Sequence, residues 1–163
     1  MSVSVVSRFA AAAVVTAGIS GVAASAQVNV LMQHNDPARS GDNLHETILT
    51  PADVNGRQFG MQFKHRVDDQ VYSQPLILTD VLVGGGYHDL AFVTTVNNSV
   101  YAFDANDPTA TEPLWHVNFG TPARVHDYDF GCLDLNGNMG IIGTPAVDSA
   151  RHVLYPALFV KTR

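Results

Sequence analysis

The sequence predicts an all-β protein preceded by a secretory signal peptide. From Phe59 onward, short apolar runs alternate with turns rich in Gly, Asn and Asp, and no helical period accompanies them. The first 26 residues carry a single charge, Arg8. With 163 residues, the chain is long enough for one modest domain.

The N-terminal segment has the three parts of a signal peptide. Arg8 gives the positive region, residues 9–24 are uncharged, and Ala24-Ser25-Ala26 is a small-x-small cleavage pattern. A membrane anchor is the alternative, but the run is Ala/Gly-rich and falls short of the ~20 strongly apolar residues that a span needs. We expect cleavage near Ala26 and a secreted or periplasmic protein without a membrane span.

The charge of the chain restricts its partners. The formal net charge is −6, which argues against nucleic acid and anionic membranes as partners. Cys132 is the only cysteine, so the chain cannot form an internal disulfide.

The pattern after residue 58 predicts a series of strands. The first is Phe59–Val67, in which alternate residues share one face. Four more follow with short links, and we expect them to form one antiparallel sheet in sequential order. They are Val71–Leu78, Leu90–Thr95, Ser99–Phe103 and Leu114–Asn118. A glycine turn is expected at Val83–His88, and a tight turn at Asn97-Asn98.

A weak internal repeat extends this pattern. Pro75 and Pro145 each lead a short apolar strand, and Phe63 and Trp115 are 52 residues apart, close to the period of some repeat folds. Between the copies lies an irregular insert, residues 120–139, and the second copy is expected to contain strands at 141–148 and 153–160.

One stretch resembles the repeat of pyrroloquinoline-quinone-type β-propellers. The matching residues are Ala102-Phe103-Asp104, followed after a polar loop by Trp115, although the usual Thr-Gly after the Asp is absent. Residues 33–41 and Gly143–Asp148 are also similar to the start and second blade of such proteins. The resemblance implies that Asp104 accepts hydrogen bonds from turn amides and that Trp115 lies buried between blades.

The expected organisation is therefore a signal peptide (1–26), an irregular segment (27–58) and an incomplete β-propeller (59–163). The propeller part would hold about one and a half four-stranded antiparallel blades, with blade strands in 71–118, the insert in 120–139 and the next blade starting in 141–160. With so few blades, we expect an apolar face of Phe92, Val93, Val100 and Phe103 to be partly exposed and to favour self-association.

The insert contains the candidate metal ligands. Asp134, Asn136 and Asn138 alternate as at the start of a calcium loop, but Met139 and Pro145 stand where an EF-hand needs Gly and Glu. A solvated loop is the alternative.

Two classes of function remain open. Quinoproteins of this fold hold pyrroloquinoline quinone and calcium at the centre of a full ring, with a Trp floor and often a vicinal cysteine pair. Because this chain has one Trp and one cysteine, no catalytic or cofactor residue carries over, and no cofactor is expected in this fragment. The first expectation is a non-catalytic module that binds a protein or carbohydrate or serves as a scaffold. The alternative is the N-terminal piece of a secreted quinone-dependent dehydrogenase, so whether the chain is an enzyme stays open.

Overall fold

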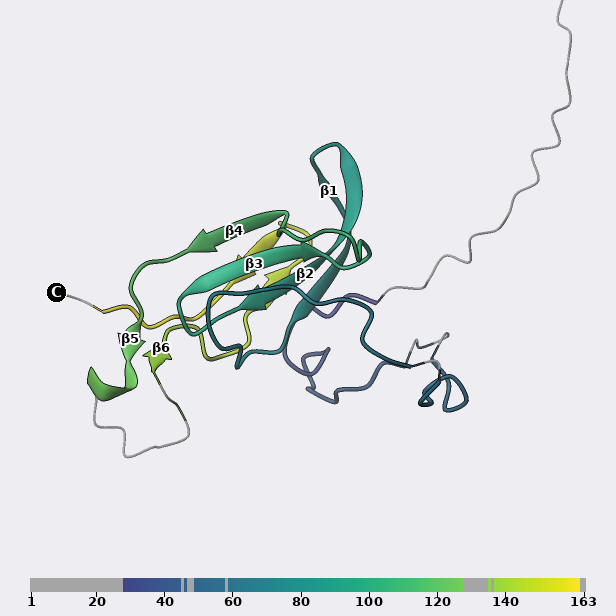
Figure 1. Ribbon diagram of the computed structural model, residues 1–163, viewed down its shortest axis with the longest axis horizontal. Helices are drawn as coiled ribbons and strands as arrows, with labels where there is room; N and C mark the ends of the chain where they lie inside the picture. Colours follow the sequence, from purple (N-terminus) through teal and green to yellow (C-terminus); the bar gives the residue numbers. More distant parts are fainter. Residues whose placement is uncertain are drawn as a thin grey trace, which may run out of the picture.

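A computed structural model describes residues 28–44, 46, 49–57, 59–127, 135 and 137–161. Its centre is one antiparallel sheet of four strands in the order β1-β2-β3-β4 (Figure 1). The strands are β1 (Leu76–Val83), β2 (Gly86–Thr94), β3 (Ser99–Asp104) and β4 (Trp115–Asn118). The all-β class and the sequential antiparallel order of these four strands are confirmed.

Two small sheets follow in the chain. β5 (Ala123–Arg124) pairs with β6 (Asn138–Met139), and a short 3₁₀ turn, η1 (Val125–Asp127), comes directly after β5. β7 (Ala146–Asp148) and β8 (Val153–Tyr155) form a hairpin. The expected strands at 141–148 and 153–160 are thus shorter than predicted.

The first hairpin differs from its prediction in position. β1 begins after Pro75 rather than at Val71, and β2 begins at Gly86, so only Gly84 and Gly85 form the turn. Both have positive φ, +59° and +91°, as the tight turns that match the twist of a hairpin require. The predicted turn at Val83–His88 is therefore too long, because Gly86 and His88 already belong to β2.

The turn between β2 and β3 fastens distant parts of the chain. Asn98 has φ +60° and is fully buried. Its Nδ2 donates hydrogen bonds to the carbonyl oxygens of Phe159 (2.9 Å) and Gly120 (3.3 Å). A Cβ at Gly140 would overlap Asn98 Oδ1 and the Val96 carbonyl oxygen, so only glycine fits there.

The predicted strand at Phe59–Val67 is wrong: no strand forms there. Its alternation holds only in the second half, where Phe63, His65 and Val67 are half-buried and the residues between them are exposed. Phe59 and Met61, which the prediction placed on the same face, are 58% and 80% exposed. The segment covers one face of the sheet, where the His65 ring stacks on Phe103 with 4.2 Å between centroids. Alternating burial therefore came from packing on a sheet, without strand pairing.

The opposite face of the sheet carries the main core. Leu76, Leu78, Leu90, Phe92 and Ala102 form it, and β7 and β8 pack against it through Val147 and Leu154. Before β1, the backbone of Val30 forms an antiparallel bridge with Ile77.

The expectation of an exposed apolar face at Phe92, Val93, Val100 and Phe103 is wrong for this set. Phe92, Val100 and Phe103 are 6%, 1% and 2% exposed, and Val93 is half-buried. The segment around His65 covers Phe103, and the core formed with β7–β8 encloses Phe92.

Within the described residues, no helix has the length and apolar character needed to cross a membrane.

Candidate binding hollow beside Trp115

The face of the sheet that carries the main core is only partly covered, and an apolar hollow of about 330 Å³ lies there. Its sheet side includes Phe92, Val100, Trp115 and Val117, and its hairpin side includes Val153 and Leu154. These residues share one face because Val100 pairs with Val117, and Ala102 pairs with both Phe92 and Trp115. The hollow therefore lies between the sheet and the β7–β8 hairpin.

Trp115 does not have the buried position expected of it. It is 38% exposed, and its ring lies 6.1 Å from that of Phe92 between centroids. Val117 and Phe119, which also line the hollow, are 37% and 47% exposed. Trp115 thus lies on the face of the sheet that carries the main core, where the β7–β8 hairpin covers it only in part.

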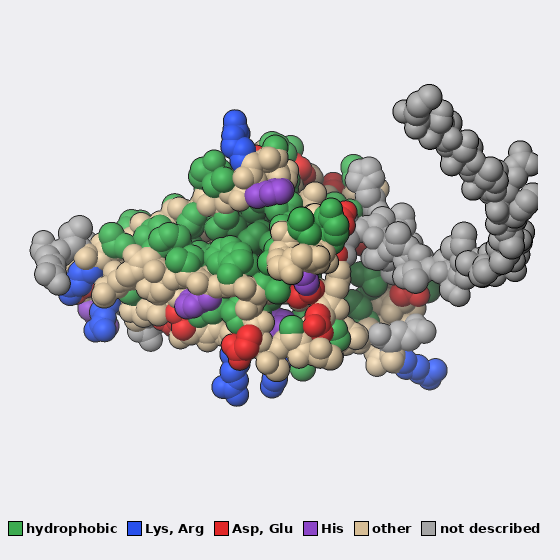
Figure 2. Space-filling model, turned by 90° about the horizontal axis from the view of Figure 1, so that it is seen from above, with side chains coloured by type: hydrophobic (Ala, Val, Ile, Leu, Met, Phe, Trp, Pro, Cys, Tyr) green, Lys and Arg blue, Asp and Glu red, His purple; other side chains and the backbone are tan. Residues whose placement is uncertain are grey.

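Figure 2 shows the molecule from the side on which β4 lies in Figure 1, and hydrophobic side chains form a patch on this face. Of the described residues that line the hollow, His152 is the only one with a titratable side chain. The site is therefore suited to apolar side chains or apolar ligands.

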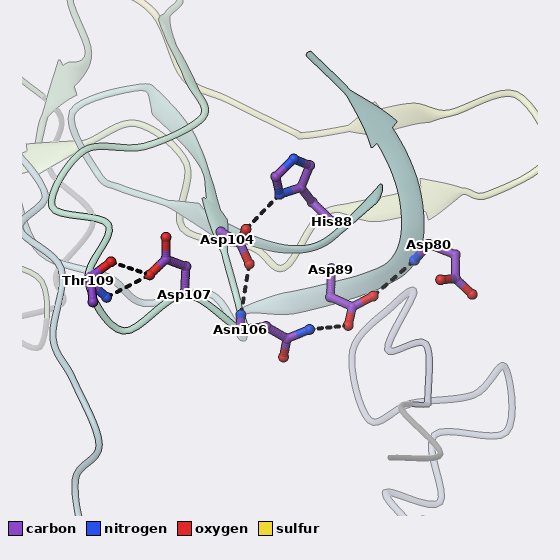
Figure 3. A network of polar contacts seen from close by, with 7 residues as sticks. All are labelled: Asp80, His88, Asp89, Asp104, Asn106, Asp107 and Thr109. Carbon is purple, nitrogen blue, oxygen red and sulfur yellow. Dashed lines mark hydrogen bonds and ion pairs between the residues drawn. The ribbon is translucent and has the colours of Figure 1, made fainter. Parts of the chain in front are cut away.

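Asp104 lies at the end of β3 and holds the turn that follows it (Figure 3). Its Oδ1 accepts a hydrogen bond from the Asn106 backbone N–H (2.9 Å), the kind of turn contact expected of this residue. Its Oδ2 accepts a hydrogen bond from His88 Nδ1 (2.6 Å). Burial alone would raise the pKa of Asp104, but these hydrogen bonds and the charge of His88 outweigh it and hold the pKa below its ordinary value.

Asp89 ties the same loop to β1 (Figure 3). It accepts hydrogen bonds from the Asp80 backbone N–H (2.9 Å) and from Asn106 Nδ2. Asp80 has φ +57° and lies where the register between β1 and β2 shifts. These carboxylates stabilise a bulge and a loop, and their oxygens are occupied by donors of the chain itself.

A second polar cluster surrounds Asp68. Its carboxylate accepts hydrogen bonds from the side chains of Thr95 (2.7 Å), Asn97 (2.7 Å) and Ser99 (2.5 Å). Burial would raise the pKa of Asp68, but the donated hydrogen bonds lower it below its ordinary value. The cluster fixes the segment after Val67 to the β2–β3 turn.

The candidate metal ligands are only partly placed. Asp134 and Asn136, like Cys132, lie outside the described residues. Asn138 is in β6, and its Nδ2 donates a hydrogen bond to Asp69 Oδ2 (2.8 Å). In the part of the chain that the structure describes, no group of three or more His, Cys, Asp or Glu side chains is arranged to hold a metal ion.

The two prolines of the repeat lie at corresponding places. Pro75 directly precedes β1, and Pro145 directly precedes β7. A hydrogen bond from the Gln74 backbone N–H to Thr144 Oγ1 (2.9 Å) links the residues before them.

The hollow could not be predicted from the sequence, because its lining residues are distributed from Leu78 to Pro156 along the chain.

No protein-family model, curated protein sequence or solved structure matches this chain.

Proposed function

We propose that this chain is an exported, quinoprotein-like β-propeller module that acts by binding or as a scaffold rather than by catalysis. The observation that carries the proposal is the position of β7–β8, whose Val147 and Leu154 pack on the face of the four-stranded sheet. In a propeller, consecutive antiparallel sheets are repeated around an axis and bury their faces against one another. The sequential order β1-β2-β3-β4 supports a blade over a sandwich, where Greek-key connections are the rule.

The character of the hollow supports the binding of an apolar group. Pyrroloquinoline quinone is a multiply charged carboxylate, so it needs cationic or hydrogen-bonding partners. The described lining offers apolar side chains and a single titratable one, His152. The hollow therefore does not fit the quinone, which quinoproteins of this fold hold at the centre of a full ring instead.

The proposed export rests on the sequence alone. Arg8, the uncharged run after it and Ala24-Ser25-Ala26 have the order of a cleavable leader.

Quinone binding to the purified chain tests this proposal against the dehydrogenase alternative. The chain is incubated with calcium and pyrroloquinoline quinone and desalted, and then quinone absorbance and dye-linked oxidation of alcohols and sugars are measured. We expect no retained quinone and no turnover above a heat-inactivated control. Stoichiometric retention, or turnover, would overturn the non-catalytic proposal in favour of the dehydrogenase.

A further inference from the structure

The turn before the segment that covers one face of the sheet contains an Asn-Gly pair, Asn55-Gly56. It lies in residues 49–57, which form neither a helix nor a strand. Asn55 is half-buried and Gly56 is exposed. A Cβ built on Gly56 would meet no atom within 4 Å. The backbone at Gly56 is therefore open to solvent and has room to move.

The side-chain amide of Asn55 is held close to its own backbone. Its Oδ1 accepts a hydrogen bond from the Arg57 backbone N–H (3.0 Å), which makes an Asx-turn. Its Nδ2 donates hydrogen bonds to the carbonyl oxygens of Ala52 (2.7 Å) and Asp53 (3.4 Å). The ring that the bond to Oδ1 closes contains both Asn55 Cγ and the Gly56 nitrogen, so this bond limits rotation of the amide away from that nitrogen.

The same hydrogen bond activates the amide carbon of Asn55. A donor at a carbonyl oxygen draws electron density from the carbon and stabilises negative charge that develops on the oxygen, as the donors of an oxyanion hole do. Among the described residues, no acceptor takes a hydrogen bond from the Gly56 N–H. Glycine also has the widest choice of backbone conformations, so this peptide unit can rotate until its nitrogen faces Cγ.

We propose that Asn55 is a site of spontaneous deamidation. The Gly56 nitrogen attacks Asn55 Cγ, and the new N–Cγ bond closes a five-membered succinimide ring. The Cγ–Nδ2 bond breaks, and Nδ2 leaves as ammonia with the proton from the Gly56 N–H. Water then adds to one of the two ring carbonyls, and the ring opens to aspartate or isoaspartate at position 55. The reaction needs water alone, and the inference does not depend on the proposed propeller module.

Both products change the turn. Each adds a negative charge close to Asp53, in a chain whose formal net charge is already −6. Isoaspartate also adds a methylene group to the main chain and converts the Asn55 carbonyl into a free carboxylate. That carbonyl oxygen now accepts a hydrogen bond from the Phe59 backbone N–H (2.9 Å). The modification would therefore alter the link between this turn and the segment 59–67 that covers the sheet.

The test incubates the purified chain at neutral and at alkaline pH and follows the tryptic peptide of residues 40–57 by mass spectrometry. This peptide does not contain the other Asn-Gly pair, Asn136-Gly137. We expect the mass gain of an amide-to-acid change to grow with time at Asn55, with isoaspartate as part of the product. The change should be faster at alkaline pH, because the attack requires loss of the Gly56 N–H proton.

Gly56→Ala is the decisive variant. Its Cβ has space and Gly56 does not have a positive φ, so the fold should persist. The added methyl group hinders the attack and should slow the change at least tenfold. Gly60→Ala is the matched control, since a Cβ there also meets no atom within 4 Å, and it should leave the rate at Asn55 unchanged.

Three results would overturn the inference. They are no conversion at Asn55, conversion at the same rate in Gly56→Ala, and conversion of Asn98 as fast as that of Asn55. Asn98 is fully buried and precedes a serine, so in the folded chain it should stay unmodified.

Discussion

At the residue scale, Asp68 connects the segment that covers one face of the sheet to the turn between β2 and β3. Three side-chain donors, those of Thr95, Asn97 and Ser99, point to its carboxylate. Asp68→Ala would leave these donors without their acceptor, and hydrogen bonds to charged groups contribute about 1.5–3 kcal/mol each. We expect the free energy of unfolding in urea to fall by about 2 kcal/mol or more.

Asp127→Ala is the control for this substitution. Asp127 forms a partly exposed ion pair with Lys161 at 3.4 Å, and such pairs contribute about 0–1 kcal/mol. If both variants lost equal stability, the cluster around Asp68 would have no special role.

The pKa of Asp68 gives a pH dependence with a definite sign. Its pKa is lower in the folded chain than its ordinary value, so the folded state favours the ionised carboxylate. This stabilisation is fully present above the unfolded-state pKa of about 3.9 and is lost as the pH falls through the lower folded-state pKa. The difference in unfolding free energy between the native chain and Asp68→Asn should therefore be constant from pH 7 to about 5 and shrink below about pH 4. A difference that grew on acidification would contradict this assignment.

At the element scale, the β1–β2 hairpin depends on its two-residue turn. Gly84 and Gly85 both have positive φ. Gly84→Asn creates the Asn-Gly pair that such turns favour and should raise the free energy of unfolding by about 0.5 kcal/mol, because it restricts the unfolded chain. Gly85→Val should lower it by about 1–2 kcal/mol, since a β-branched residue is strained at positive φ. Thermal and urea unfolding measure both, and equal effects of the two variants would exclude this turn geometry.

The strands of the sheet and the segment before them show which elements can be predicted from the sequence and which cannot. β2 and β3 were predicted to within a few residues, because their apolar β-branched runs end at clear turn signals. Phe59–Val67 has an equally good alternation, but period alone does not reveal whether a partner strand is available. The predicted start of β1 was too early, because nothing in the sequence before Pro75 shows that Val71–Gln74 lack a partner strand. Its predicted end was also too early, because the strand continues past its apolar run through the bulge near Asp80.

The candidate site was harder to predict than the strands. Trp115 was predicted to lie buried against a neighbouring sheet, and it does line the hollow. Its exposed fraction could not be predicted, because that fraction depends on which strands lie above it. His152, Val153 and Leu154 reach the site only because β7 and β8 fold back over the sheet, and no local pattern encodes that return.

At the scale of the whole molecule, the leader is the feature most easily tested. Expression of the full chain with export should give a protein whose first residue is Gln27, because Ala24-Ser25-Ala26 has small residues at the two positions that signal peptidase recognises. N-terminal sequencing of the exported material provides the measurement. Ala26→Arg is the matched variant and should block processing, and a soluble chain that keeps Met1 would refute the leader.

The buried Asn98 also sets an order for assembly during synthesis. Each strand from β1 to β4 pairs with its neighbour in sequence, so this sheet can close once Asn118 has left the ribosome, and such local closures are fast. The bond from Asn98 Nδ2 to the Phe159 carbonyl spans 61 residues and cannot form until Phe159 has been synthesised. Until then the Asn98 amide has no acceptor from that segment, and β7–β8 do not yet cover the core. The nascent sheet therefore exposes an apolar face while the forty or so residues between Asn118 and Phe159 are synthesised, which takes about 2–8 seconds at 5–20 residues per second. A chaperone that binds apolar surface would have its opportunity in that interval.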